Sequence, residues 1–316
     1  MAGASVKAER VEGSSVEVFL QSDMVQEVIS MVERPIPGAD KVMVVKPAKN
    51  NAEIETLEHE NLEGPVGLIE IPTNIGNIRS LVYNDHLLST IFFFEGPDVD
   101  VYKRRRNQIV RQQSLSDVHL FPGGTDAVVI YDKSEAAFRR TATQQERAQI
   151  ARTLQGESTS LESVSAKEIR EGDMAVIAEA RTEEFVVERT GDEKIETAFV
   201  DVNHDEVSID VKEVEPNQSD SIGAQISNPC TSDCDPAEWT VDASSCVLNV
   251  ISPAGCRSCN LVCSARMSAP GYVACFICAT QICSVSLYNY CSCIDAIYCI
   301  VELGLDGAER LEDVFF

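Results

Sequence analysis

Cysteine is the residue type through which this sequence could do chemistry, and its distribution divides the chain. All twelve cysteines lie between residues 230 and 299, and the residues before them contain none. Cysteines gathered in this way form disulfides, bind metal ions or pack as buried thiols. The twelve are Cys230, Cys234, Cys246, Cys256, Cys259, Cys263, Cys275, Cys278, Cys283, Cys291, Cys293 and Cys299.

The spacing of these cysteines predicts short helices. Cys256, Cys259 and Cys263 follow the i, i+3, i+7 pattern, which places them on one stripe of an α-helix. Cys275 and Cys278 repeat the i, i+3 step. Sequences typical of turns follow both runs, so we expect a mainly helical module whose helices are stapled face to face by disulfides.

Three interpretations of the cysteines remain open. A disulfide scaffold fits an even number of cysteines in a short segment, and each closed loop contributes about 2–4 kcal/mol. Zinc binding would use two Cys-x-x-Cys pairs, Cys256 with Cys259 and Cys275 with Cys278. Eight cysteines would then remain without a metal. Buried free thiols are the third possibility. We favour disulfides, which need no cofactor, over a module that needs zinc.

The charge of the chain restricts its partners. The formal net charge is −25. Residues 1–229 contribute −18 and residues 230–316 contribute −7. An acidic surface repels the phosphate backbone, so we do not expect nucleic-acid binding. Arginine also outnumbers lysine, 17 to 9. Such a surface is typical of proteins in concentrated salt, where repulsion between carboxylates is screened within about 3 Å at 1 M.

The part before the cysteines is predicted to be an α+β domain with a mixed or antiparallel sheet. A helix begins at Ser22 or Asp23, and its valine stripe ends before Pro35. Further helices are expected over 135–140, capped by Ser134, and after Thr143, with Glu146 in the capping-box position. Predicted strands are 41–46, 66–71, 79–83, 87–95 and 127–132, followed by an antiparallel meander over 174–180, 184–190, 194–202 and 206–214.

No pattern in this domain predicts catalysis, and we expect that the protein is not an enzyme. The sequence contains no P-loop, nucleophile elbow, HExxH or GxGxxG motif. The basic cluster Lys103–Arg106 could contact an acidic partner or mark a cleavage site, but we interpret it as a solvated helix face. The four histidines, His59, His86, His119 and His204, are far apart in the sequence.

Three regions follow from these patterns. Residues 1–214 form the acidic, cysteine-free domain, and residues 230–316 form the cysteine-rich module. Residues 215–229 are rich in Pro, Asn, Ser and Gly without an apolar period, which is typical of a linker. Proteases cut most easily at such exposed segments.

This layout resembles the precursors of halocin C8-like antimicrobial peptides from haloarchaea. The local resemblance lies in GCRSCNLVC (255–263), GYVACFIC (271–278) and the spaced cysteines up to Cys299. The resemblance implies that the C-terminal part is released as a disulfide-rich toxin. It also implies that the N-terminal part is the leader or immunity region and that it binds the module.

The same resemblance implies secretion after processing and a target in a cell membrane or an envelope protein. The uncharged run over 272–290 is near the length that spans a membrane. Two features depart from the family. The first twenty residues are polar and contain no export signal, and an acidic segment follows Cys299. The alternatives are a cytoplasmic protein with a zinc-binding tail and a β-rich binding domain, or a surface protein with a stapled anchor.

Overall fold

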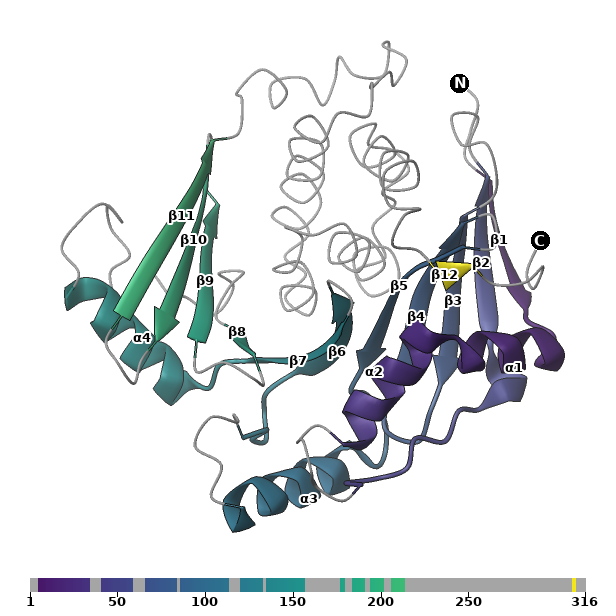
Figure 1. Ribbon diagram of the computed structural model, residues 1–316, viewed down its shortest axis with the longest axis horizontal. Coiled ribbons are helices and arrows are strands. Elements are labelled where there is room, and N and C mark those ends of the chain that lie inside the picture. The colour runs from purple at the N-terminus through teal and green to yellow at the C-terminus, as the bar shows by residue number, and fades with distance from the viewer. Residues whose placement is uncertain are drawn as a thin grey trace.

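The computed structural model describes most of the N-terminal domain and one short segment near the C-terminus (Figure 1). The cysteine-rich region and the linker predicted at 215–229 lie outside the described residues. Described are residues 5–34, 41–58, 66–83, 86–113, 120–132, 135–156, 177–179, 184–190, 194–201, 206–213 and 309–310.

The described strands form one antiparallel sheet, in which the first eleven strands lie side by side in sequence order. Together with a few helices, this gives the N-terminal region the α+β character predicted from the sequence. A twelfth strand pairs with β5 from far along the chain. The strands are β1 (Ser5–Arg10), β2 (Glu53–Glu58), β3 (Val66–Pro72), β4 (Asn77–Tyr83), β5 (His86–Phe93), β6 (Ala127–Asp132), β7 (Glu135–Thr141), β8 (Ile177–Glu179), β9 (Glu184–Thr190), β10 (Lys194–Asp201), β11 (Glu206–Glu213) and β12 (Glu309–Arg310).

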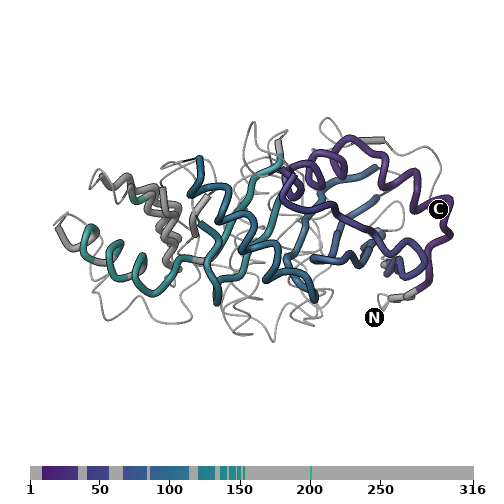
Figure 2. The backbone as a smooth tube through the Cα atoms, turned by 90° about the horizontal axis from the view of Figure 1, so that it is seen from below, coloured from purple at the N-terminus to yellow at the C-terminus, as the bar shows by residue number. Residues whose placement is uncertain are grey.

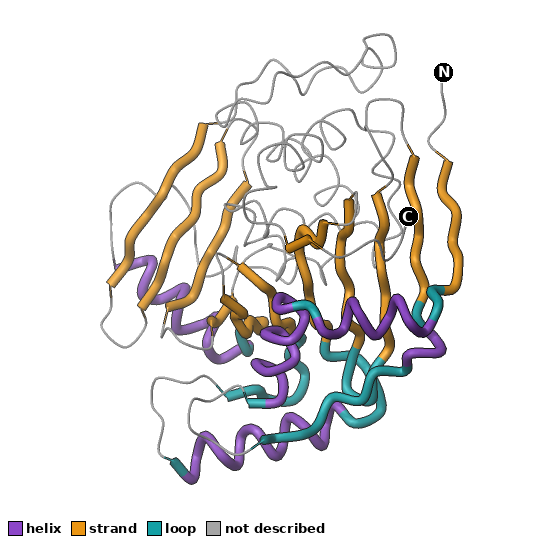
Figure 3. Tube along the Cα trace, turned by 45° about the vertical axis from the view of Figure 1, so that its right-hand side comes forward, coloured by secondary structure: helices purple, strands orange, loops and turns teal. Residues whose placement is uncertain are grey.

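Four described α-helices accompany the sheet: α1 (Gly13–Gln21), α2 (Asp23–Glu33), α3 (Val99–Gln112) and α4 (Gln144–Gly156), with the short 3-10 helix η1 (Lys49–Asn51). Figure 1 shows α1 and α2 crossing in front of the N-terminal strands. The helices and connecting loops gather on the lower side of the strands in Figure 3. Seen from below, α1 and α2 lie toward one end of the long axis and α4 toward the other (Figure 2).

One face of the sheet packs against these helices, and we call it the helix face. Residues directly opposite each other in antiparallel strands share a face, and one such row runs from β4 through β5 and β6 to β7. The valine stripe of α2 lies in the same buried core as this row. The helix face comprises Ile69, Ile71, Ile78, Phe92, Val129 and Phe138.

The opposite face carries a second apolar set, which we call the back face. Its rows join Leu68 to Leu81, Ile91 to Ile130, and Phe93 to Val128 across neighbouring strands. Each of these six side chains is at most 4% exposed, yet none belongs to the core cluster formed with the helices. The central strands are therefore apolar on both faces. The back face comprises Leu68, Leu81, Ile91, Phe93, Val128 and Ile130.

Most of the predicted elements are present. Helix α2 begins after Ser22, and Val25, Val28 and Val32 are fully buried. The strands predicted over 66–71, 79–83, 87–95 and 127–132 correspond to β3, β4, β5 and β6. The predicted meander corresponds to β8–β11, with consecutive strands antiparallel.

Two predictions were wrong. Residues 41–46 are not a strand, because their backbone amides bond to side chains: Val45 N–H donates to Glu33 Oε1 (3.0 Å) and Lys46 N–H to Asn74 Oδ1 (2.8 Å). Residues 135–140 are not a helix but belong to β7, and all six of them pair with β6. Pairing in the sheet here overrides the local helical preference of Glu, Ala and Arg.

Candidate functional site

The site residues predicted from the sequence cannot be placed. All twelve cysteines, including the alternative zinc ligands Cys256, Cys259, Cys275 and Cys278, lie outside the described residues. Within the described part of the chain, no group of three or more His, Cys, Asp or Glu side chains could hold a metal ion. None of the described helices is both long and apolar enough to cross a bilayer.

At the edge of β5, the described segment of the C-terminal part of the chain pairs with the N-terminal domain. Strand β6 pairs with Ile91–Phe93, which is only the C-terminal part of β5. The N-terminal part is paired with β12: Glu309 lies opposite Leu87, and Arg310 lies opposite His86. Because β4 occupies the other edge of β5 at these same two residues, β12 lies on the edge that β6 leaves open.

This pairing has a structural reason. An unpaired strand edge presents free N–H and C=O groups, and proteins protect such edges by pairing or covering them. Leu87 is fully buried, so unpaired backbone groups beside it would be costly. Adding a strand to an open edge is a recurrent way of binding an extended segment. The edge of β5 can therefore hold the segment that follows the last cysteine.

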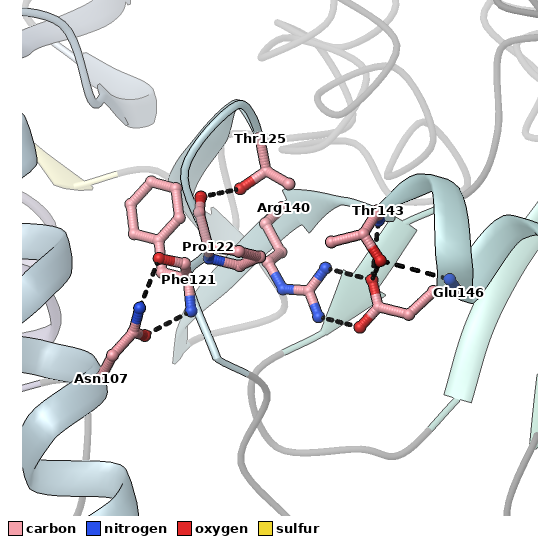
Figure 4. A network of polar contacts seen from close by, with 7 residues as sticks. All are labelled: Asn107, Phe121, Pro122, Thr125, Arg140, Thr143 and Glu146. Atoms are coloured by element: carbon pink, nitrogen blue, oxygen red, sulfur yellow. Dashed lines mark hydrogen bonds and ion pairs between the residues drawn. The ribbon is translucent and has the colours of Figure 1, made fainter.

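A second polar assembly lies on the helix face, where β7 continues into α4 (Figure 4). The guanidinium of Arg140 donates two hydrogen bonds to Glu146, Nη2 to Oε1 (2.6 Å) and Nη1 to Oε2 (2.8 Å). Thr143 N–H donates to Glu146 Oε2 (2.7 Å), and Glu146 N–H donates back to Thr143 Oγ1 (3.2 Å). This reciprocal pair is the capping box predicted from the sequence.

The contacts of Glu146 determine its charge. Burial raises the pKa of this carboxyl, but hydrogen bonds from Arg140 and Thr143 and the charge of Arg140 outweigh burial and lower the pKa to about 2. Arg140 is only 1% exposed. A buried arginine needs a carboxylate that stays ionised, so this network fixes the start of α4 against β7.

Helix α3 is attached to the same region by its polar side chains (Figure 4). Asn107 Nδ2 donates to the carbonyl of Phe121 (2.7 Å), while Phe121 N–H donates to Asn107 Oδ1 (2.6 Å). Thr125 Oγ1 donates to the carbonyl of Pro122 (2.7 Å) and closes the turn before β6. These bonds satisfy backbone groups of the loop before β6 and hold Phe121 in the aromatic core.

The basic cluster on α3 is only partly the solvated face that the sequence suggested. Arg104 and Arg105 are exposed, but Arg106 is fully buried, with its guanidinium over the ring of Phe138 at 4.4 Å from the centroid. Burial lowers the pKa of Arg106 to about 10. Arg106 lies one helical turn after buried Tyr102 and therefore points toward the core.

No family model matches the sequence, and no curated protein and no solved structure is similar to it. The function must therefore be inferred from the residues and contacts of the chain. The polar network around Arg140 connects β7 with α4, which follows it directly in the sequence. By contrast, the edge of β5 joins segments more than two hundred residues apart. Pairing at that distance has no local sequence signal, so the sequence could not reveal it.

Proposed function

We propose that the chain is the precursor of a secreted, disulfide-stapled antimicrobial peptide. The cysteine-rich module over 230–316 is the toxin, and the domain over 1–214 is its leader or immunity region. The domain holds the module until a protease cuts the linker over 215–229. The observation that carries this proposal is the complete segregation of twelve cysteines from a cysteine-free domain.

The chemistry of the two parts supports this division of roles. A short module with an uncharged run over 272–290 exposes apolar surface when alone, and such surfaces aggregate or bind membranes. Up to six disulfides would keep the released module compact without a large core. A domain without cysteines cannot exchange disulfides with the module. The pairing of β12 with β5 is consistent with a domain that retains the module before release.

The test is the intact mass of the protein recovered from its native culture at high salt, with thiols alkylated before and after reduction. We expect a separate fragment that begins near residues 215–245 and takes up label only after reduction. This fragment should inhibit the growth of related strains. A full-length chain that is alkylated without reduction and releases zinc to a chelator would contradict the proposal and establish a zinc-binding tail.

A further inference from the structure

The back face of the sheet is buried, although the described helices pack on the other side. Helix α2 lies against β5, β6 and β7 in the core that contains Phe92 and Val129. Phe93, the next residue in β5, points to the opposite face and is 4% exposed. Its partner across the strand pair, Val128, is 2% exposed. The guanidinium of Arg79 covers one side of the Phe93 ring, 4.8 Å from its centroid, but neither it nor the described helices explain the burial of the whole face.

The segment that covers the back face must be able to reach it. The position of β12 shows which part of the chain can do so. Glu309 follows Cys299 by ten residues, and ten extended residues span at most about 35 Å. The strands from β3 to β6 are three spacings apart, which is roughly 14 Å. Because Glu309 is paired to β5 within this set of strands, the cysteine-rich region is tethered within reach of the whole back face.

The composition of the cysteine-rich region also suits it to cover the back face. The run over 272–290 contains apolar, cysteine and small polar residues and no charged side chain, in a chain of net charge −25. Two largely apolar surfaces on one highly charged chain gain most by covering each other. Such cover also keeps a continuous apolar surface away from solvent and from other molecules.

We infer that the back face of the sheet, together with the β5 edge at His86 and Leu87, is the docking surface for the cysteine-rich region of the same chain. The segment at Glu309–Arg310 fastens the region by strand addition, and the apolar run over 272–290 covers the back face. This inference deepens the proposed function and rests on it for its purpose, since it names the surface by which the domain holds the module.

Photo-crosslinking of the full-length, oxidised chain tests this docking. Phe93 lies on the back face, and Tyr83 also faces that side because it follows core residue Val82 in β4. Each is replaced by p-azidophenylalanine, which is similar in size. Val18, which is 42% exposed on α1, receives the same replacement as a control. Irradiation of an equal mixture of ¹⁴N- and ¹⁵N-labelled protein is followed by digestion and mass spectrometry.

We expect Phe93→p-azidophenylalanine and Tyr83→p-azidophenylalanine to crosslink to peptides from residues 256–299 with a single isotope label, and the Val18 variant to give no such product. Mixed-isotope products would show that a second copy covers the face. A folded variant without peptide crosslinks would show a bare face. Either result would overturn the inference.

A second measurement needs no substitution. In hydroxyl-radical footprinting of the unmodified chain, Phe93 should react at a rate similar to that of core residue Phe92, whereas a bare back face would make Phe93 react many times faster. These tests concern docking and not release. A docked tail that is never cleaved upholds this inference and contradicts the antimicrobial proposal, whereas a released peptide with a bare back face does the reverse.

Discussion

Both faces of the central sheet bury apolar side chains, but they differ in what buries them. The helix face packs against α1, α2 and α3 in one core of aliphatic and aromatic side chains. The back face is just as buried, yet it lies outside that core. Antiparallel sheets commonly cover one face and solvate the other. A sheet with two apolar faces needs a covering layer on each of them.

The two faces also differ in how their buried arginines are paired. On the helix face, Arg140 is held by two short bonds to Glu146 inside a capping box. On the back face, Arg79 bonds Glu70 (Nε to Oε2, 3.0 Å) and lies 3.6 Å from the carboxylate of Glu95. Both of these partners are more exposed than Glu146. The carboxylates on the back face are therefore more accessible to water than Glu146, while Arg79 itself is buried over the ring of Phe93.

The largest expected changes in stability come from substitutions at two neighbouring residues of β5, one on each face. Phe92→Ala removes a fully buried ring from the helix face and should reduce the free energy of unfolding by about 3–5 kcal/mol. Phe93→Ala should cost about 3 kcal/mol in the full chain if the tail covers the back face. Urea unfolding at high salt measures both. A cost below about 1 kcal/mol for Phe93→Ala would mean that the face is not packed.

The next comparison uses two of the buried arginines, one on each face of the sheet. Arg140→Ala removes one partner of a buried pair and should cost about 3 kcal/mol. Arg79→Ala should cost about 1 kcal/mol, because its partners remain accessible to water. Exposed Arg152 is the control, and Arg152→Ala should change the unfolding free energy by less than about 0.5 kcal/mol. Equal costs at Arg79 and Arg140 would remove the distinction between the faces.

The pH dependence of stability sharpens the description of the helix face. The pKa of Glu146 is lowered from 4.5 to about 2, so its contribution is fully present above pH 4.5 and is lost as the pH falls toward 2. After allowing for solvent screening, we expect a loss of about 1–2 kcal/mol over this range. Glu146→Gln cannot ionise and should therefore lack this pH-dependent part of the unfolding free energy. Parallel acid-unfolding curves for the two proteins, with a constant difference across pH 2–4.5, would contradict the assignment.

The smallest expected effect concerns the start of α4. Thr143→Ala should cost about 1 kcal/mol, because the N–H of Glu146 loses its acceptor. Thr143→Ser keeps the hydroxyl and should retain most of the stability. Thermal unfolding of both variants measures the difference. Equal melting temperatures for the alanine and serine variants would show that the capping box contributes nothing.

The sequence predicted those elements whose pattern is local. The valines of α2 repeat with helical spacing, and Thr143 with Glu146 forms a recognisable capping box. Helix α1 was missed because no capping side chain marks its start at Gly13. The strand predicted over 41–46 was wrong because its amides bond to distant Glu33 and Asn74, which no local pattern reveals.

The candidate site depended on contacts between residues that are far apart in the sequence. The spacing of the cysteines suggested a stapled module, but nothing near Glu309 indicates that it pairs with Leu87. Similarly, the many apolar residues of β4 and β5 indicate buried strands but not what covers each face. The role of a sheet face is set by tertiary contacts, which the alternation of a single strand does not encode.

The most direct test of the central claim is hydrogen exchange at the amides of His86 and Leu87 in the full chain. The double variant Glu309→Pro/Arg310→Pro removes the backbone donors of β12, and Glu309→Ala/Arg310→Ala is the control that keeps them. If the tail is fastened to β5, the proline variant should exchange about two- to tenfold faster at the one of these two amides that points to β12, and the alanine variant should match the parent. Equal exchange in all three proteins would contradict the account.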